Sequence, residues 1–212
     1  LERQHGISTR TLAIDLAQPD GAERLADAIA DLEIGILVNN AGFGGAGRFD
    51  LLEASRLRDM IAVNCLAPVL LTLRILPGMR ARRRGAVVIT GSVAGRQPLP
   101  LHSVYSATKA FDLLFGEALW VELRGASVDV LVLEPGSTQT EFQQVAGELA
   151  HPGDSAERVV AVALEALGQQ PSVIPGWTNW LRANFATRIG SRPLVAFLAR
   201  QVMEVQTPAH LR

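Results

Sequence analysis

The sequence predicts an α/β fold in which helices cover both faces of a doubly wound parallel sheet. Short apolar runs rich in Val, Ile and Leu alternate with longer helical stretches. These runs show no regular polar alternation, so we expect both faces of each strand to be covered. We expect residues 1–176 to form one domain, and residues 177–212 to form a helical tail packed on that domain or on a partner.

The expected elements follow from periodicity and from helix start and stop signals. Asp20 with Glu23, and Asp154 with Glu157, have the spacing of capping boxes. The expected strands are 9–16, 34–40, 85–92, 128–136 and 172–176, and the expected helices are 22–32, 51–83, 104–125 and 154–167. The stretch 51–83 is expected to be interrupted near Pro68 and to end near Pro77.

Composition excludes several classes of protein. The net charge of −1 does not suggest a nucleic-acid partner. Apolar runs such as 69–73 are far shorter than the roughly 20 residues of a membrane span. The single cysteine, Cys65, cannot form an intrachain disulfide and fits a reducing compartment, so we expect a cytoplasmic protein. We expect no metal site.

A glycine-rich motif, "GFGGAG" at 42–47, has the G-x-G-x-x-G pattern of a pyrophosphate loop. An acidic residue is expected about 20 positions later in such a site, but residues 60–66 read "MIAVNCL". The motif is therefore interpreted as a loop, with pyrophosphate binding kept as the alternative.

Tyr105 is the single tyrosine of the chain, and Lys109 is the only lysine among 20 basic residues. Residues at i and i+4 share a helix face. A nearby ammonium lowers the pKa of a phenol, which brings the phenol toward acid–base use near neutral pH. Taken alone, the pair could equally be a surface pair on an amphipathic helix.

Two further polar residues suggest a site. Ser92 ends an expected strand and could donate to a carbonyl oxygen, or it could simply cap a turn. Asn64 lies in an apolar helical stretch, where its amide could hold a backbone group or a water, or could be a core amide that bends the helix.

Taken in order, these residues resemble the short-chain dehydrogenase/reductase family. The resemblance rests on Asp15, "NNAG" at 39–42, Asn64, Ser92, Tyr105-x-x-x-Lys109 and "PGSTQT" at 135–140. It covers residues 10 to about 176. It implies a Rossmann-like fold and the interconversion of an alcohol and a carbonyl with NADP or NAD, with NADP favoured.

The resemblance also implies roles for individual residues. Tyr105 would exchange the proton with the carbonyl or alcohol oxygen. Lys109 would lower the pKa of Tyr105 and bind the nicotinamide ribose. Ser92 would polarise the carbonyl, and Asn64 would anchor a water behind Lys109. Besides Tyr105 and Lys109, the implied cofactor-binding residues are Asp15, Leu16, Asn39, Ala41, Gly42, Pro135, Gly136, Thr138 and Thr140, of which Thr138 stands where the family often has an aliphatic residue.

The start of the chain departs from the family pattern. The family begins with two strand–helix units and a glycine-rich turn, and these 212 residues contain neither. In the sheet order 3-2-1-4-5-6 the first two strands lie between 9–16 and 34–40. We therefore expect an incomplete sheet, with the edge of strand 34–40 bare, in what is a piece of a longer protein.

The tail and the partners are less constrained. Trp177, Trp180 and Phe185, with arginines between them, could lie on a membrane surface or pack on the protein. The resemblance implies a homodimer or homotetramer formed through the long helices. The apolar residues expected to suit that interface are Phe111, Leu114, Phe115, Ala118 and Leu119.

Two functional hypotheses remain. The first is an oxidoreductase acting on a small-molecule carbonyl or alcohol, possibly lipophilic or bearing an acyl chain. The second is a non-catalytic relative, or a fragment unable to bind the dinucleotide.

Overall fold

A computed structural model of the chain describes residues 2–186, 188 and 190–212. Its centre is a parallel sheet in the order β1 (Ile36–Asn39), β2 (Gly85–Thr90), β3 (Val128–Leu133), β4 (Ser172–Val173). The strands pair in register, with Val38 opposite Val88 and Val88 opposite Leu131. The parallel α/β sheet with covering helices confirms the expected fold class.

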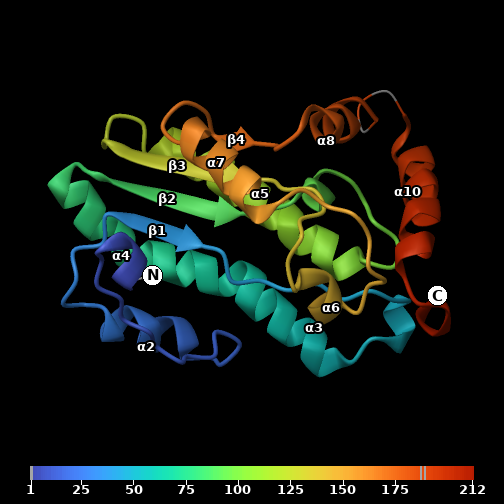
Figure 1. Ribbon diagram of the computed structural model, residues 1–212, viewed down its shortest axis with the longest axis horizontal. Coiled ribbons are helices and arrows are strands. Elements are labelled where there is room, and N and C mark those ends of the chain that lie inside the picture. The colour runs from blue at the N-terminus through green and yellow to red at the C-terminus, as the bar shows by residue number, and fades with distance from the viewer. Residues whose placement is uncertain (1, 187, 189) are drawn as a thin grey trace.

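Helices cover the sheet on both faces (Figure 1). On one face, Val87, Ile89 and Val130 pack against Met79 of α4 (Ala67–Arg82) and Leu119 of α5 (Ser103–Glu122). α2 (Gly21–Ala28) packs on the outside of α4. On the other face, α7 (Ala156–Ala166) covers Leu131 and Leu133 of β3. Alternate side chains of β3 therefore enter two separate cores.

The expected strand at 9–16 is wrong. These residues follow α1 (Glu2–His5) as irregular chain and are mostly exposed. A strand is stable only when a neighbour accepts and donates its backbone hydrogen bonds, and no described segment pairs with 9–16. The outer edge of β1 is also unpaired in the part of the chain that the structure describes. Its Ile36 and Val38 side chains are 55% and 56% exposed, because they lie on the face that α7 covers only farther along the sheet, at β3.

The stretch 51–83 contains one continuous helix, which includes both Pro68 and Pro77. After η1 (Phe49–Leu51), α3 (Ala54–Ile61) runs through a π-helical segment, η2 (Ala62–Leu66), into α4. The interruption lies just before Pro68, but the end expected near Pro77 is wrong. Pro77 leaves the carbonyl of Leu73 without its intrahelical donor, and water can satisfy it because Leu73 is 68% exposed.

This helix, Ala54–Arg82, also passes a length and composition test for a membrane span, with a mean hydropathy of 1.8 over its most apolar window. The expectation based on uninterrupted apolar runs therefore did not identify this helix as a candidate membrane span. In the structure the helix packs on β1, β2 and α2 as a layer of the domain.

The helix caps differ from the expected capping boxes. Asp20 precedes α2 without a side-chain cap bond. α7 is capped by Ser155, whose Oγ accepts from the Arg158 amide, rather than by Asp154. Asp154 accepts from the Arg158 guanidinium instead, so its carboxylate is occupied by an ion pair.

The C-terminal segment lies beyond the carboxyl ends of the strands (Figure 1). It comprises α8 (Trp177–Leu181), the π-helical η4 (Arg182–Ala186), α10 (Arg192–Gln206) and η5 (Ala209–Leu211); positions 187 and 189 of the expected tail lie outside the described residues. Backbone bonds from Arg48 N to Leu211 O (2.8 Å) and from Leu149 N to Gln206 O (2.8 Å) join it to the domain. Trp177 and Trp180 are 75% and 51% exposed.

Packing of α5 on β3 requires a glycine. A Cβ on Gly116 would lie 2.2 Å from Val132 Cγ2, so Gly116→Ala should force the helix and strand apart. Overpacking of this kind costs roughly 1–3 kcal/mol. Thermal and urea unfolding should show the loss.

Gly78→Ala is the matched control, because its Cβ would meet only the flexible Arg82 guanidinium, at 3.1 Å. Helix propensity predicts that this change is neutral or stabilises by up to about 1 kcal/mol. Equal effects of the two substitutions would contradict the proposed contact.

Candidate active site

Ser92 lies where β2 gives way to η3 (Val93–Arg96). Its Oγ caps that turn by accepting from the Ala94 amide (3.1 Å), and it lies 3.4 Å from the carbonyl oxygen of Pro135. It also forms a hydrogen bond with Tyr105, which opposes the rise of that phenol's pKa. Ser92 therefore caps η3 and contacts Tyr105 at the same time.

Tyr105 occupies the first turn of α5 and faces Ser92. Its ring packs against Phe142, with centroids 5.4 Å apart. Burial raises the pKa of Tyr105 well above its ordinary value, and the charges of Glu148 and Asp112 raise it further. The expected lowering of this pKa by Lys109 is therefore not what the structure shows.

Lys109 has buried polar partners of its own. The buried Nζ donates to the Thr90 carbonyl (2.7 Å) and to Asp112 Oδ2 (3.0 Å). Asp112 is itself buried, and its charge adds to the rise in the pKa of Tyr105 that burial causes. Burial raises the pKa of Asp112, while Lys109 opposes that rise.

Asn64 lies in the π-helical segment η2 and is almost fully buried. Its Oδ1 accepts from the Phe43 amide (3.1 Å), and its Nδ2 donates to the Phe43 carbonyl (3.0 Å) and to Thr108 Oγ1 (3.0 Å). The side chain thus joins the loop after β1 to α5. A Cβ on the neighbouring Gly42 would lie 3.2 Å from Asn64 Oδ1 and 3.5 Å from Lys109 Nζ.

The end of β3 is attached to the same region. Glu134, which is fully buried, accepts two hydrogen bonds from the Arg96 guanidinium (2.6 and 2.5 Å), and this pair fixes η3 beside β3. The carbonyl of Pro135 accepts from the Val93 amide (3.1 Å). Gly136 lies against α8, since a Cβ there would be 2.6 Å from Asn179 Nδ2.

The expected site residues thus form two groups: Ser92 contacts Tyr105 and Pro135, and Gly42 lies beside Asn64 and Lys109. α5, which carries both Tyr105 and Lys109, connects the two groups. The other expected cofactor residues have local partners. Thr138 Oγ1 donates to the Gly136 carbonyl, and Thr140 Oγ1 accepts from the Phe142 amide. Both threonines precede α6 (Phe142–Ala146).

The four residues expected near the adenosine lie within the first 41 positions of the chain. Asp15 is exposed and accepts from the Ala17 amide, which lowers its pKa. Leu16 packs in the cluster beneath α2. Asn39 is buried and donates to Thr72, whereas Ala41 is exposed. None of these four residues forms a hydrogen bond or ion pair with the side chains of Ser92, Tyr105 or Lys109.

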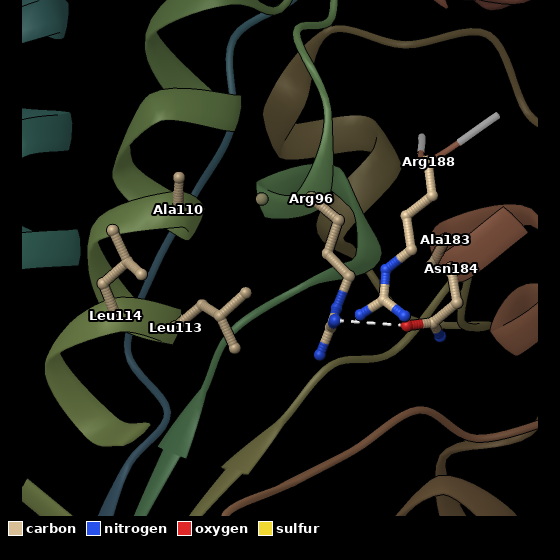
Figure 2. Close-up of a pocket in the computed structure, with 8 residues that line it drawn as sticks. Arg96, Ala110, Leu113, Leu114, Ala183, Asn184 and Arg188 are labelled. Atoms are coloured by element: carbon tan, nitrogen blue, oxygen red, sulfur yellow. Dashed lines mark hydrogen bonds between the residues drawn. The ribbon is translucent and has the colours of Figure 1, made fainter. Parts of the chain in front are cut away.

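The loop 42–47 leads into the short 3-10 helix η1 rather than directly into an α-helix, in agreement with the loop interpretation. A separate pocket of about 230 Å³ lies between α5, η3 and the C-terminal segment (Figure 2). It is lined by Gly95, Arg96, Ala110, Leu113, Leu114, Ala183, Asn184 and Arg188, and none of these is an expected site residue.

Sequence reasoning missed several polar partners of the site. Asp112 lies three residues after Lys109, a spacing that places the two on one helix face and could have been noticed. Glu148 and His151 have the same i, i+3 spacing. Their meeting with His102 joins segments 46 residues apart and had no local signal.

Similar sequences and structures identify the family of the chain. A profile described as short chain dehydrogenase matches residues 1–149. The chain is 34% identical over 175 residues to the very-long-chain 3-oxoacyl-CoA reductase of Homo sapiens, covering 80% of this chain and 55% of the relative. It is 31% identical over 195 residues to very-long-chain 3-oxoacyl-CoA reductase-A of Danio rerio, covering 86% and 60%. The chain therefore spans a little over half the length of these relatives.

Solved structures show the same fold. A 7β-hydroxysteroid dehydrogenase superposes with a TM-score of 0.84 at 27% identity, covering 93% of this chain and 79% of that one. A short-chain dehydrogenase from Sphingobium yanoikuyae, in complex with NADPH, superposes with a TM-score of 0.78 at 28% identity, covering 85% and 73%. With the profile match and the fold in agreement, the chain belongs to the short-chain dehydrogenase family.

Proposed function

We propose that this protein is an NADP- or NAD-dependent oxidoreductase that interconverts a carbonyl and an alcohol, with Tyr105 as its acid–base group. The observation that carries the proposal is the hydrogen-bonded pair of Ser92 and Tyr105, with Lys109 one helical turn behind the phenol. Two hydroxyls that converge in this way can bind one carbonyl oxygen between them.

The electrostatics favour reduction as the direction in which Tyr105 acts as a donor. Burial raises the pKa of Tyr105, so the phenol is protonated at neutral pH, as a group that gives a proton to a carbonyl oxygen must be. Ser92 donates to the same oxygen and orients it. The dinucleotide, when bound, supplies the hydride.

The residues present fit the nicotinamide side of such a cofactor. Two of the three N–H bonds of Lys109 are directed at Thr90 and Asp112, which leaves one for a ribose hydroxyl. Gly42 lies beside Lys109, and the Pro135 carbonyl lies beside Ser92, so both backbones are near the groups proposed to act. NADP is favoured because a structural relative at 28% identity was solved with NADPH.

The substrate proposed is a lipophilic ketone, with a 3-oxoacyl chain as the first candidate. Support comes from the names of the relatives, which are very-long-chain 3-oxoacyl-CoA reductases and a hydroxysteroid dehydrogenase. The aromatic contact of Phe142 with Tyr105 gives the site an apolar wall suited to such a chain.

Tyr105→Phe should lower kcat by about 100-fold or more, because it removes only the proton donor. Dinucleotide affinity should change little. Fluorescence titration with NADPH and NADH, followed by turnover of 3-oxoacyl thioesters, tests both points on the protein from its complete reading frame. If the wild-type protein binds neither dinucleotide, the oxidoreductase proposal is wrong and a non-catalytic relative remains.

Asp112→Asn should move the basic limb of the pH profile of kcat/KM to lower pH. The Asp112 carboxylate raises the pKa of Tyr105, so its neutralisation lowers that pKa and the phenol loses its proton earlier as the pH rises. Asp129→Asn, at an exposed position on β3, is the matched control. An unchanged or higher limb would contradict this coupling.

We also propose that the protein is a homo-oligomer assembled through α4 and α5. α5 carries an exposed apolar stripe that includes Phe111 (41% exposed), Leu114 (69%) and Val121 (60%), and Leu73 of α4 is 68% exposed. Of the residues expected in this interface, Leu119 is excluded because it is a core residue, whereas Phe115 is partly buried and packs against the core.

Leu114→Glu should therefore reduce the molar mass measured by light scattering toward that of a monomer, since it places a charge within the stripe. Leu164→Glu on α7 is the control, because Leu164 is similarly exposed (64%) on the opposite face of the sheet. A wild-type protein that is already monomeric would refute the assembly.

A further inference from the structure

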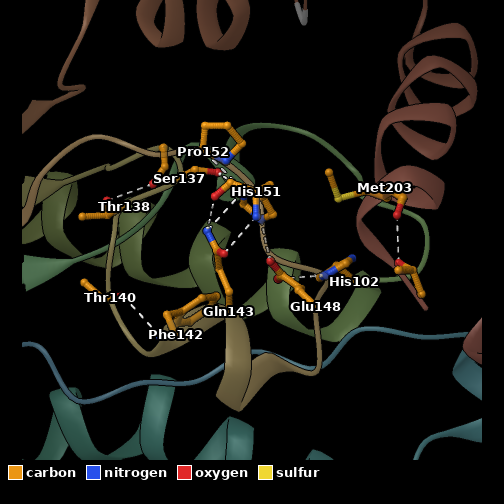
Figure 3. A network of polar contacts seen from close by, with 12 residues as sticks. His102, Ser137, Thr138, Thr140, Phe142, Gln143, Glu148, His151, Pro152 and Met203 are labelled. Carbon is orange, nitrogen blue, oxygen red and sulfur yellow. Dashed lines mark hydrogen bonds and ion pairs between the residues drawn. The ribbon is translucent and has the colours of Figure 1, made fainter.

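One buried carboxylate joins the catalytic helix to the segment that covers it (Figure 3). Glu148 Oε1 lies 3.1 Å from His102 Nε2, and Glu148 Oε2 lies 3.0 Å from His151 Nε2. The Glu148 side chain is only 8% exposed, and that of His102 only 3%. Because a carboxylate only accepts, both imidazoles must present Nε2–H to it.

His151 has further hydrogen-bond partners besides Glu148. Its Nδ1 lies 3.0 Å from Ser137 Oγ, and its backbone amide and carbonyl form two hydrogen bonds with the Gln143 side chain. These bonds fold residues 141–151 back on themselves. We call these residues the lid segment. The hydrogen bonds from the two histidines lower the pKa of Glu148 despite its burial, so it is ionised at neutral pH.

On the other side, His102 is the residue that precedes α5, three positions before Tyr105. The lid segment carries Phe142, whose ring packs on that of Tyr105. The lid is also joined to its surroundings by Ala46 N to Ala146 O (2.9 Å) and by Arg56, which donates to the Val145 carbonyl. Glu148 is thus the polar side-chain link between the lid segment and the start of the catalytic helix.

Such a link adds little stability as a purely structural contact. Burying a carboxylate is unfavourable unless its partners offset the lost hydration, and an apolar cluster of the same volume would be about as stable. A buried charged contact between the lid segment and α5 does, however, favour two distinct arrangements. In one the contact is intact, and in the other it is broken and its charged group is hydrated.

We propose that Glu148 is a positioning residue that latches the lid segment over Tyr105 through His102 and His151. Released, the lid admits a bulky ketone; latched again, it holds Phe142 and the substrate against the phenol and excludes water. The proposal rests on the proposed reaction for its purpose, but the latch itself is a property of the free protein.

The test compares Glu148→Gln with Glu141→Gln, which makes the same change at an exposed position of the same segment. The amide of glutamine cannot accept from two imidazole N–H groups through both of its terminal atoms. Loss of a charge-assisted hydrogen bond should increase amide hydrogen exchange across Phe142–Ala146 about tenfold or more, whereas β3 keeps its protection. The control should leave both regions unchanged.

Turnover gives a second readout. Glu148→Gln should raise KM for a long-chain ketone several-fold more than it lowers kcat, and it should leave the NADPH dissociation constant unchanged. Unchanged exchange in α6, or an equal change in the control, overturns the latch. If Glu148→Gln does not fold, His151→Leu, which removes the hydrogen bonds of the lid imidazole to Glu148 and Ser137, is measured in the same way and decides.

The exchange experiment needs neither cofactor nor substrate. A protein that binds no dinucleotide would therefore refute the proposed function and leave the exchange result standing. Normal turnover with unchanged exchange would refute the latch alone.

Discussion

The hydrogen bond from Lys109 to the Thr90 carbonyl fixes the geometry on which the site depends. It holds the second turn of α5 against the last residue of β2, which places the phenol of Tyr105 beside the hydroxyl of Ser92. The approach is close because η3 crosses α5 at a glycine. A Cβ on Gly95 would lie 2.5 Å from the Lys109 carbonyl carbon. Helix, strand end and turn therefore form one rigid unit.

Buried charge is distributed around this unit in three clusters. Arg96 with Glu134, and Glu148 with His102 and His151, join segments that would otherwise be connected only by packing, whereas Lys109 and Asp112 pair within α5. Buried charged contacts of this kind add little net stability, because desolvation cancels much of their attraction. Their contribution is directional: the first two clusters hold loops in place, and the charges of Glu148 and Asp112 raise the pKa of Tyr105.

The sequence was sufficient for the parts that depend on local pattern. The buried strands, the helix that carries Tyr105 and Lys109, and the convergence of strand ends all follow from apolar runs and from the geometry of a parallel sheet. It failed where tertiary partners decide. Residues 9–16 have the composition of a strand but no neighbour to pair with, and the helix continues past Pro77 because water can take the place of the missing donor. The partners of Lys109 and Glu148 depend on burial, which no spacing rule supplies.

The bare side of β1 has a consequence for handling the protein. A parallel strand whose N–H and C=O groups point to one open side, with Ile36 and Val38 beside them, is a template on which another strand can grow. Other copies of the chain, misfolded chains and peptides compete for that template. Concentration, ionic strength and the presence of a complementary strand will therefore decide whether preparations of these 212 residues stay dispersed or associate edge to edge.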